Sequence, residues 1–200
     1  MKVTPARILL VAVAAGGLGL LASLWRDGNP LWRTRTGERA LHAAATATAP
    51  APPAGVTPAG IGDPMPVIAL PGLDGKIVDL TVNYRDKRLL VNVWASWCGP
   101  CIEEMPELQR FAAAQGADGV QVVGLALDTA DGVRDFLARV PVGYPIVLDT
   151  PGPADASVWL GNAKGVLPYT VLVGADGRIK RQKIGPFQPG EISGWAGQVR

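Results

Sequence analysis

The sequence predicts a mixed α/β fold for residues 61–200, with helices on both faces of a central sheet. Three observations support this fold class: short apolar runs of β-forming residues, amphipathic stretches between them, and a hairpin pattern near the end of the chain. The resulting order, β-α-β-α-β followed by a β-hairpin and a helix, is typical of a mixed sheet flanked by helices. The 200-residue chain is 48% apolar and 18% charged, which suits a protein that buries a core.

The elements of this domain follow one another through short connections. Apolar β-forming runs mark the strands, helical spacing of apolar residues marks the helices, and Pro/Gly clusters mark the turns. In chain order we expect strands at 65–70 and 76–80 around a loop at 71–75, a strand at 88–95, a helix at 100–115, a strand at 120–127, a helix at 132–140, a short strand at 146–148, a helical turn at 154–160, strands at 169–174 and 178–184, and a helix at 192–199.

The strand at 178–184 is strongly basic. It carries Arg178, Lys180, Arg181 and Lys183. Charged side chains commonly protect the edge of a sheet from pairing with another chain. We therefore interpret these residues as edge protection rather than as a docking site.

An uncharged apolar run, residues 8–25, precedes the domain. As a helix it would span roughly 27 Å, close to the ~30 Å hydrocarbon core of a bilayer. A cleaved signal peptide has a shorter apolar region, about 7–15 residues, followed by a small-residue cleavage site. We therefore expect a cytoplasmic tail at 1–7 and one uncleaved transmembrane helix at 8–25, with a cleaved signal peptide as the alternative. A buried core helix fits less well, because the run has no amphipathic stripe.

Residues 26–60 are predicted to be an Ala/Pro-rich linker, since 43–60 consists almost entirely of Ala, Pro, Thr and Gly. Charge is distributed unevenly along the chain. Residues 1–60 hold six Lys/Arg against two Asp/Glu, whereas residues 61–200 hold thirteen against fifteen. A slightly acidic domain argues against a nucleic-acid partner, which would require a basic stripe on the folded part.

The chain has one histidine, His42, and two cysteines, Cys98 and Cys101. A structural zinc site needs four ligands, so these three residues do not supply one. A Cys–His or Ser–His–Asp hydrolase needs a histidine in the folded domain, and His42 precedes the predicted domain. A disulfide-framework mini-protein needs more cysteines. No metal site is predicted.

The two cysteines occupy a position that favours redox chemistry. A predicted strand runs into Cys98-Gly99-Pro100-Cys101, and a predicted helix follows. The positive end of the helix dipole and unpaired backbone N–H groups favour thiolate at Cys98, so its pKa is expected below the ~8.5 of a free thiol. Cys101, one turn further, is expected to be more buried and to resolve the mixed disulfide that Cys98 forms. Pro100 suits a first helical turn because it lacks an N–H.

Two other interpretations of this pair fit the sequence less well. Half of a zinc site is disfavoured because the other ligands are missing. A static structural disulfide is disfavoured because so short a loop yields little chain-entropy stabilisation. A CxxC between a buried strand and a helix most strongly indicates a redox-active dithiol.

The segment NVWASWCGPCIEEMPEL, residues 92–108, closely resembles the active-site region of the thioredoxin superfamily. It is most similar to the membrane-anchored TlpA/ResA/DsbE-like thiol-disulfide oxidoreductases. The resemblance covers roughly residues 60–200 and includes LPGLDGKIVDL and GVLPYTVLVGADGRI. It implies a thioredoxin-like fold with an N-terminal β-hairpin extension and a central insertion around 141–165.

The resemblance also assigns site residues. Pro168 matches the family's cis-proline, which lies against the CxxC and presents the preceding Leu167 to substrate. Glu104 matches a glutamate that acts as a buried acid/base in ResA-like members, whereas thioredoxin uses an aspartate at the position of Asn92, which cannot titrate. The alternative for Glu104 is a solvated surface charge like Glu103 and Glu107. The substrate surface would include Trp97, Gly99, Pro100 and Leu167.

The resemblance implies a disulfide reductase on the periplasmic side of the bacterial inner membrane. The count of basic residues around 8–25 does not by itself favour that orientation. Implied substrates are disulfides of apocytochrome c or of copper-site assembly proteins, and the implied electron donor is a DsbD/CcdA-type membrane protein. No cofactor is expected beyond the Cys98–Cys101 disulfide, and the tethered domain is expected to be a monomer.

Three rival functions remain for this sequence. A disulfide oxidase or isomerase of the same fold would differ only in reduction potential. A thiol-based copper metallochaperone is disfavoured, because such relatives use CxxxC and a histidine in the domain. A peroxiredoxin-like peroxidase is disfavoured because the PxxxTxxC pattern is absent from the sequence.

Overall fold

A computed structural model of the protein describes residues 34–197. Contacts divide the chain between Leu41 and His42, so helix α2 (Arg35–Ala47) begins in the first unit and ends in the second. The predicted tail at 1–7 and transmembrane helix at 8–25 lie outside the described residues. No helix within the described part of the chain is both long and apolar enough to cross a membrane.

Helix α2 lies inside the segment predicted to be a uniform linker. Its second half, LHAAATA, is rich in alanine, which has the highest intrinsic helix propensity. Prolines follow at 50, 52 and 53, beyond the last helical residue, where they cannot continue a helix. Low-complexity composition therefore gave no indication of this helix, because alanine suits a linker and a helix equally well.

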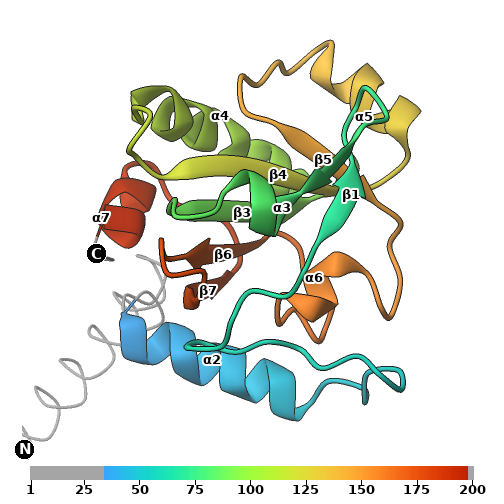
Figure 1. Ribbon diagram of the computed structural model, residues 1–200, viewed down its shortest axis with the longest axis vertical. Helices are drawn as coiled ribbons and strands as arrows, with labels where there is room; N and C mark the ends of the chain where they lie inside the picture. The colour runs from blue at the N-terminus through green and yellow to red at the C-terminus, as the bar shows by residue number, and fades with distance from the viewer. Residues whose placement is uncertain (1–33, 198–200) are drawn as a thin grey trace, which may run out of the picture. The chain divides into compact units, whose positions relative to one another are not determined.

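A five-stranded mixed sheet forms the centre of the second unit, with strand order β5-β4-β3-β6-β7 (Figure 1). The strands are β3 (Leu89–Trp94), β4 (Gln121–Leu127), β5 (Ile146–Asp149), β6 (Tyr169–Val173) and β7 (Ile179–Ile184). The neighbours β3, β4 and β5 run parallel, whereas β6 is antiparallel to both β3 and β7. The predicted mixed sheet with helices on both faces is confirmed.

Successive side chains of the central strand enter opposite cores, because the side-chain period of a strand is two residues. Leu90 and Trp94 pack on one face, together with α4 (Gly99–Ala114), α5 (Ala130–Leu137) and α7 (Glu191–Gly197). Leu89, Val91 and Val93 pack on the other face with α3 (Leu80–Asn83) and α6 (Ala156–Trp159). We call these the α4 face and the α6 face.

The predicted N-terminal hairpin is present as a separate two-stranded sheet. Strands β1 (Ala69–Pro71) and β2 (Ile77–Asp79) pair antiparallel, and Gly75 in the connecting turn has φ of 78°. A side chain at positive φ would be strained, so the turn requires glycine there. Strand β2 is short because Asp79 caps α3 by accepting hydrogen bonds from two backbone N–H groups.

The segment before β3 also covers both edges of the large sheet. A single bridge joins Gly72 to Val147 of β5, and another joins Pro64 to Arg178 beside β7. Unpaired strand edges would be open to pairing with other chains. Backbone bridges from this segment therefore occupy part of each edge of the sheet.

Two differences from the sequence prediction have local causes. Helix α5 starts at Ala130, two residues earlier than expected, because the Thr129 hydroxyl caps it and accepts from Gly132 N at 3.2 Å. In β7, Arg181 and Lys183 are buried instead of guarding an edge. Arg181 lies 4.7 Å from the ring centroid of Trp195, and Lys183 pairs with Glu191 at 2.9 Å, so both attach α7 to the sheet.

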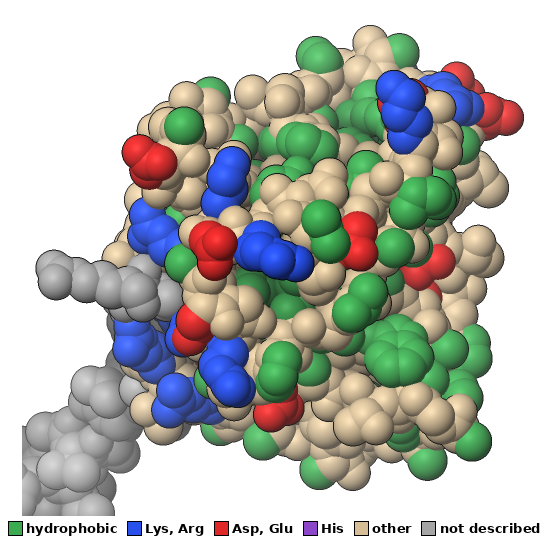
Figure 2. All heavy atoms as spheres, viewed as in Figure 1, with side chains coloured by type: hydrophobic (Ala, Val, Ile, Leu, Met, Phe, Trp, Pro, Cys, Tyr) green, Lys and Arg blue, Asp and Glu red, His purple; other side chains and the backbone are tan. Residues whose placement is uncertain are grey.

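Figure 2 shows one face of the molecule. Lys/Arg and Asp/Glu side chains are interspersed there among apolar ones.

Candidate functional site

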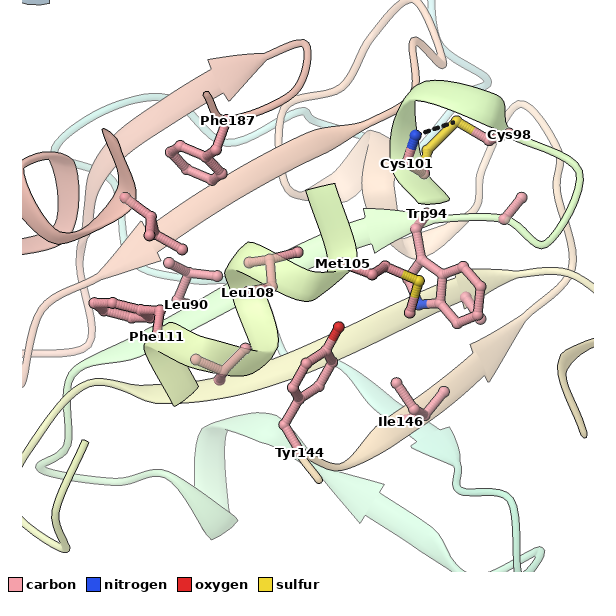
Figure 3. Packing of buried hydrophobic residues seen from close by; sticks show 14 of the residues in the cluster. Leu90, Trp94, Cys98, Cys101, Met105, Leu108, Phe111, Tyr144, Ile146 and Phe187 are labelled. Carbon is pink, nitrogen blue, oxygen red and sulfur yellow. Dashed lines mark hydrogen bonds between the residues drawn. A yellow bond between two sulfur atoms is a disulfide. The ribbon is translucent and has the colours of Figure 1, made fainter. Parts of the chain in front are cut away.

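The cysteine pair lies where β3 passes into α4. The turn that joins β3 to α4 is closed by a hydrogen bond in which Cys98 N donates to Ala95 O at 3.1 Å. Cys98 is the N-cap of α4, and its sulfur accepts from Cys101 N at 3.3 Å. Pro100 occupies the first helical turn, as predicted. Figure 3 shows both sulfurs at this end of α4, above Trp94.

The two sulfurs form a disulfide. Cys98 is 6% exposed and Cys101 is fully buried. Gly99 and Pro100 between them are exposed. An incoming group therefore reaches the site from the Cys98 side, which suits Cys98 as the attacking thiol and Cys101 as the resolving one.

The side chain next to Cys98 in the chain is exposed. The indole of Trp97 is 67% exposed, which is unusual for so large an apolar group. The Leu167–Pro168 peptide bond is cis, as the resemblance implies. Leu167 is half-buried and contacts the cores of both faces, while Pro168 O accepts from Gly185 N at 2.9 Å.

Glu104 is buried beneath the site, with 2% of its surface exposed. One carboxylate oxygen accepts from Asn92 Nδ2 at 2.8 Å, and the other accepts from Phe187 N at 2.7 Å. Burial raises the pKa of Glu104 to about 7, although both hydrogen bonds favour the charged form. The structure therefore shows a buried carboxyl here and not a solvated helix-surface charge.

This placement gives Glu104 the properties of a proton-exchanging group. It lies three residues beyond Cys101 on α4, and residues at this spacing share a helix face. A group whose pKa is near neutrality can both accept and release a proton at physiological pH. The charged groups that act on it are Lys183 of β7, which favours the ionised form, and Glu191 of α7, which opposes it.

Sequence reasoning missed a second buried carboxylate, Glu107. The sequence predicts that Glu107 is a solvated surface charge like Glu103, but Glu107 is only 9% exposed. Its oxygens accept from Gly190 N at 2.8 Å and pair with Arg110 at 2.6 Å. Glu104 and Glu107 thus hold the same β7–α7 loop through its backbone N–H groups. No local pattern indicates this, because the loop is remote in sequence.

Tyr144 is another buried polar residue of the α4 face that the sequence did not indicate. Its hydroxyl, like Trp94 Nε1 and Asn92 Oδ1, has no hydrogen-bond partner among the described residues. Burial raises its pKa, and the nearby Glu104 carboxylate raises it further. Figure 3 shows the ring directed toward α4 from the start of β5.

The structure places His42 against the domain, although the sequence indicated that no histidine lay there. Its Nε2 is 3.1 Å from both Gly161 O and Tyr169 Oη. Burial lowers the pKa of His42, while the contact with Gly161 opposes that shift. Tyr169 belongs to the α6 face, so His42 does not serve the cysteines of α4.

The described residues do not form a metal centre. Within residues 34–197, no three His, Cys, Asp or Glu side chains gather closely enough to hold a metal ion. The two sulfurs are joined to each other. The redox-active group present at this site is the Cys98–Cys101 disulfide.

Comparison with known proteins agrees with this geometry. The Redoxin family model matches residues 61–198. The thiol-disulfide oxidoreductase ResA of Geobacillus thermodenitrificans is 30% identical over 137 residues, which cover 68% of this chain and 76% of the relative. The sporulation thiol-disulfide oxidoreductase A of Bacillus subtilis is 28% identical over 121 residues, 58% of this chain and 71% of the relative.

Solved structures show the same architecture. A thioredoxin-related protein from Neisseria meningitidis serogroup B has 33% sequence identity and a TM-score of 0.57, over 64% of this chain and 96% of that one. StoA from Bacillus subtilis has 26% identity and a TM-score of 0.53, over 66% of this chain and 96% of that one. With its cysteine pair inside the matched region, the chain belongs to the Redoxin family and is a TlpA/ResA/DsbE-like thiol-disulfide oxidoreductase of the thioredoxin superfamily.

Proposed function

We propose that the protein is a protein-disulfide reductase of the periplasm, held at the bacterial inner membrane by residues 8–25. The observation that carries thiol-disulfide exchange is the asymmetry of the cysteine pair, and the direction of electron flow rests on the resemblance to reductases. Cys98 is 6% exposed and lies between the exposed residues Trp97 and Gly99, whereas Cys101 is fully buried on the same helix as Glu104. The ResA and StoA relatives support thiol-disulfide exchange as the chemistry.

The reaction starts from the reduced enzyme. The Cys98 thiolate attacks one sulfur of a substrate disulfide, forming a mixed disulfide and releasing one substrate thiolate. The Cys101 thiolate then attacks Cys98 Sγ, forming the Cys98–Cys101 disulfide and releasing the second substrate thiolate. Two electrons pass from the enzyme dithiol to the substrate, whose two thiolates take up the two protons that the cysteines lose.

Glu104 has a role in the second step. Cys101 is buried and must lose its proton before it can attack, because the thiolate is the nucleophile. The ionised Glu104 carboxylate can accept that proton and later release it to solvent or to a departing thiolate. Asn92 and Phe187 hold the carboxylate in place through its two oxygens.

The substrate surface comprises the exposed residues around Cys98. Trp97 offers an apolar face, and Gly99 and Pro100 leave the approach to the sulfur open. Leu167, before the cis-proline Pro168, offers backbone groups to an extended chain. An unfolded or loosely folded polypeptide with a disulfide fits this surface better than a compact partner does.

The partners follow from the same assignment. Each turnover leaves the enzyme oxidised, so a thiol donor must restore it, and a DsbD/CcdA-type membrane protein is the proposed one. The proposed substrates are disulfides of apocytochrome c or of copper-site assembly proteins. The domain is proposed to act as a monomer at the end of its linker.

The reduction potential of the Cys98–Cys101 pair tests the direction of electron flow. The full-length chain would be equilibrated in glutathione buffers, with tryptophan fluorescence as the signal, since Trp94 and Trp97 lie beside the site. A value near thioredoxin's, about −270 mV, supports the reductase. A value near about −120 mV would make the protein a disulfide donor and overturn the proposed direction.

A further inference from the structure

The turn that carries Trp97 and Cys98 is held from the neighbouring strand. Asp128 follows the end of β4, and Ser96 follows the end of β3. One oxygen of the Asp128 carboxylate accepts from Ser96 N at 3.1 Å and from Ser96 Oγ at 2.6 Å. The pair meets because β3 and β4 are parallel and end at the same edge, with Trp94 opposite Ala126.

The other oxygen of Asp128 binds the backbone of Thr129, the residue that caps α5. It accepts from Thr129 N at 2.7 Å, next to the cap of that helix. Burial disfavours the charged carboxylate, but the hydrogen bonds from Ser96 and Thr129 outweigh it and hold the pKa of Asp128 below its usual range. The carboxylate is therefore ionised at neutral pH, and hydrogen bonds to it are stronger than those between neutral groups.

These contacts fix one corner of a tight turn. Residues 95–98 are closed by the Cys98 N to Ala95 O hydrogen bond, which leaves Ser96 and Trp97 at the two corners. Ser96 is held twice by Asp128. Trp97 is 67% exposed, so little packing holds its indole. The direction in which Trp97 points from Cys98 therefore depends on how firmly Ser96 is held.

A neighbouring aspartate shows that this arrangement is more than a helix cap. Asp149 ends β5 much as Asp128 follows β4, and it accepts from Thr150 N at 2.8 Å and from Ala156 N at 2.7 Å. Both of its contacts are local to α6. Of these two aspartates, Asp128 is the one that contacts the turn of the cysteine site.

We propose that Asp128 is a positioning residue for polypeptide substrates: by locking the 95–98 turn it holds the Trp97 indole beside Cys98 as a fixed apolar contact. The inference rests on the proposed function, because it requires a polypeptide to lie on Trp97 during exchange. A polypeptide substrate would cover the Trp97 indole while its disulfide reacts with Cys98. A small disulfide such as oxidised glutathione would reach the Cys98 sulfur without covering the indole.

The test compares two substrates with the reduced full-length chain. Reduction of insulin disulfides reports polypeptide exchange, and reduction of oxidised glutathione reports exchange at the sulfur. The prereduced Cys98–Cys101 dithiol supplies the two electrons, so each reaction is followed as a single turnover. In Asp128→Ala we expect the half-saturating insulin concentration to rise about fivefold or more, and the ratio of the second-order rate constant for insulin to that for glutathione to fall by a similar factor. Asp128→Asn, which keeps an acceptor oxygen, should restore part of the ratio.

Asp79→Ala is the matched control. Its carboxylate also accepts from the backbone N and the hydroxyl of a single residue, Thr81, and it caps α3 on the hairpin side. We expect an unchanged substrate ratio in that variant. If Asp128→Ala does not fold, Ser96→Ala removes only the 2.6 Å hydroxyl contact, and it should shift the ratio in the same direction by a smaller factor.

A double-mutant cycle with Trp97→Ala decides whether Asp128 acts through the indole. If it does, adding Asp128→Ala to Trp97→Ala lowers insulin reduction no further. If the losses of the two single variants add, or if insulin and glutathione reduction fall equally, Asp128 does not position Trp97 for polypeptides. The proposed function still stands in that case, provided that the wild-type chain reduces insulin. A wild-type chain that fails to reduce insulin overturns the proposed function, and this inference with it.

Discussion

The two faces of the central sheet bury similar apolar cores but differ in their polar groups. The α4 face buries Asn92, Glu104, Glu107, Arg181 and Lys183. The α6 face is built mainly from Leu and Val side chains of the same strands. Burial of charge costs stability unless the charge is paired or hydrogen-bonded. The comparison indicates that most of this cost falls on the side of the cysteines, while the α6 face buries Asp155, whose carboxylate caps α6.

Two other buried polar residues of the α6 face are neutral. Tyr169 donates to Leu160 O at 3.1 Å, and Gln182 donates to Leu160 O at 2.9 Å and to Ala59 O at 2.8 Å. These are neutral groups that satisfy backbone carbonyls. They keep one charge state at neutral pH, whereas Glu104 on the other face, with a pKa of about 7, is divided between two.

The largest effect is expected from the cysteines, at the end of the α4 face. Cys98→Ser removes the nucleophile, so turnover of protein disulfides should fall to the uncatalysed background. Cys101→Ser should instead accumulate a mixed disulfide between Cys98 and substrate, visible as a mass increase that a reductant removes. Substantial turnover by Cys98→Ser would show that the site lies elsewhere.

A core truncation on the α6 face should cost stability without changing titration. Leu125 is fully buried there, so Leu125→Ala should lower the free energy of unfolding by about 2–5 kcal/mol. Urea unfolding at pH 5 and pH 8 should give the same difference from wild type. The nearly isosteric Leu125→Met is the control and should cost less than about 1.5 kcal/mol. If the loss in free energy of unfolding caused by Leu125→Ala differed between pH 5 and pH 8, the core of the α6 face would be coupled to the titrating groups of the α4 face.

Glu104→Gln should change how stability depends on pH. Burial raises the folded-state pKa above the unfolded value of 4.5, to about 7, so the protonated form favours folding. The wild type therefore loses about 3 kcal/mol as the pH rises from 4.5 through 7, and no more above that range. The variant lacks this loss, so its stability relative to wild type should rise by about that amount between pH 4 and pH 8.

The same variant should also slow the second chemical step. General acid–base groups contribute about 10²–10⁴-fold, so resolution of the mixed disulfide should slow by at least about tenfold at neutral pH. Rapid-quench measurement of the mixed disulfide isolates that step from the attack of Cys98. An unchanged resolution rate would restrict Glu104 to holding the β7–α7 loop.

The smallest effect is expected on the α6 face, from Tyr169→Phe. The change removes the hydroxyl that contacts Leu160 O and His42, which should cost about 1 kcal/mol. Thermal unfolding measures the cost, and the pH dependence of disulfide exchange should stay that of the wild type. A shift in that dependence would show that the α6 face is coupled to the cysteines.

Elements whose signal lies within a few residues could be predicted from the sequence. The strand before Cys98 and the helix after it follow from an apolar run and from the Pro100 position. The two hairpins follow from glycine-containing turns. Helix α5 starts two residues before the predicted Gly132, because Thr129 caps the helix and Ala130 is its first residue.

Contacts between residues distant in sequence could not be predicted in this way. Glu103, Glu104 and Glu107 look alike in the sequence, yet only Glu103 is exposed, because α4 turns the other two toward the sheet and the β7–α7 loop. Likewise, the basic pattern of β7 does not reveal that α7 covers Arg181 and Lys183.

The sequence by itself determined the mixed α/β class, the helix-capping cysteine pair and, through its resemblance, the cis bond before Pro168. Those features depend on side-chain period, turn chemistry and local backbone geometry. Only the tertiary structure decided the protonation behaviour of Glu104 and the hold of Asp128 on the 95–98 turn. Both depend on burial and on partners 32 to 83 residues away, which chain folding brings together and no local pattern encodes.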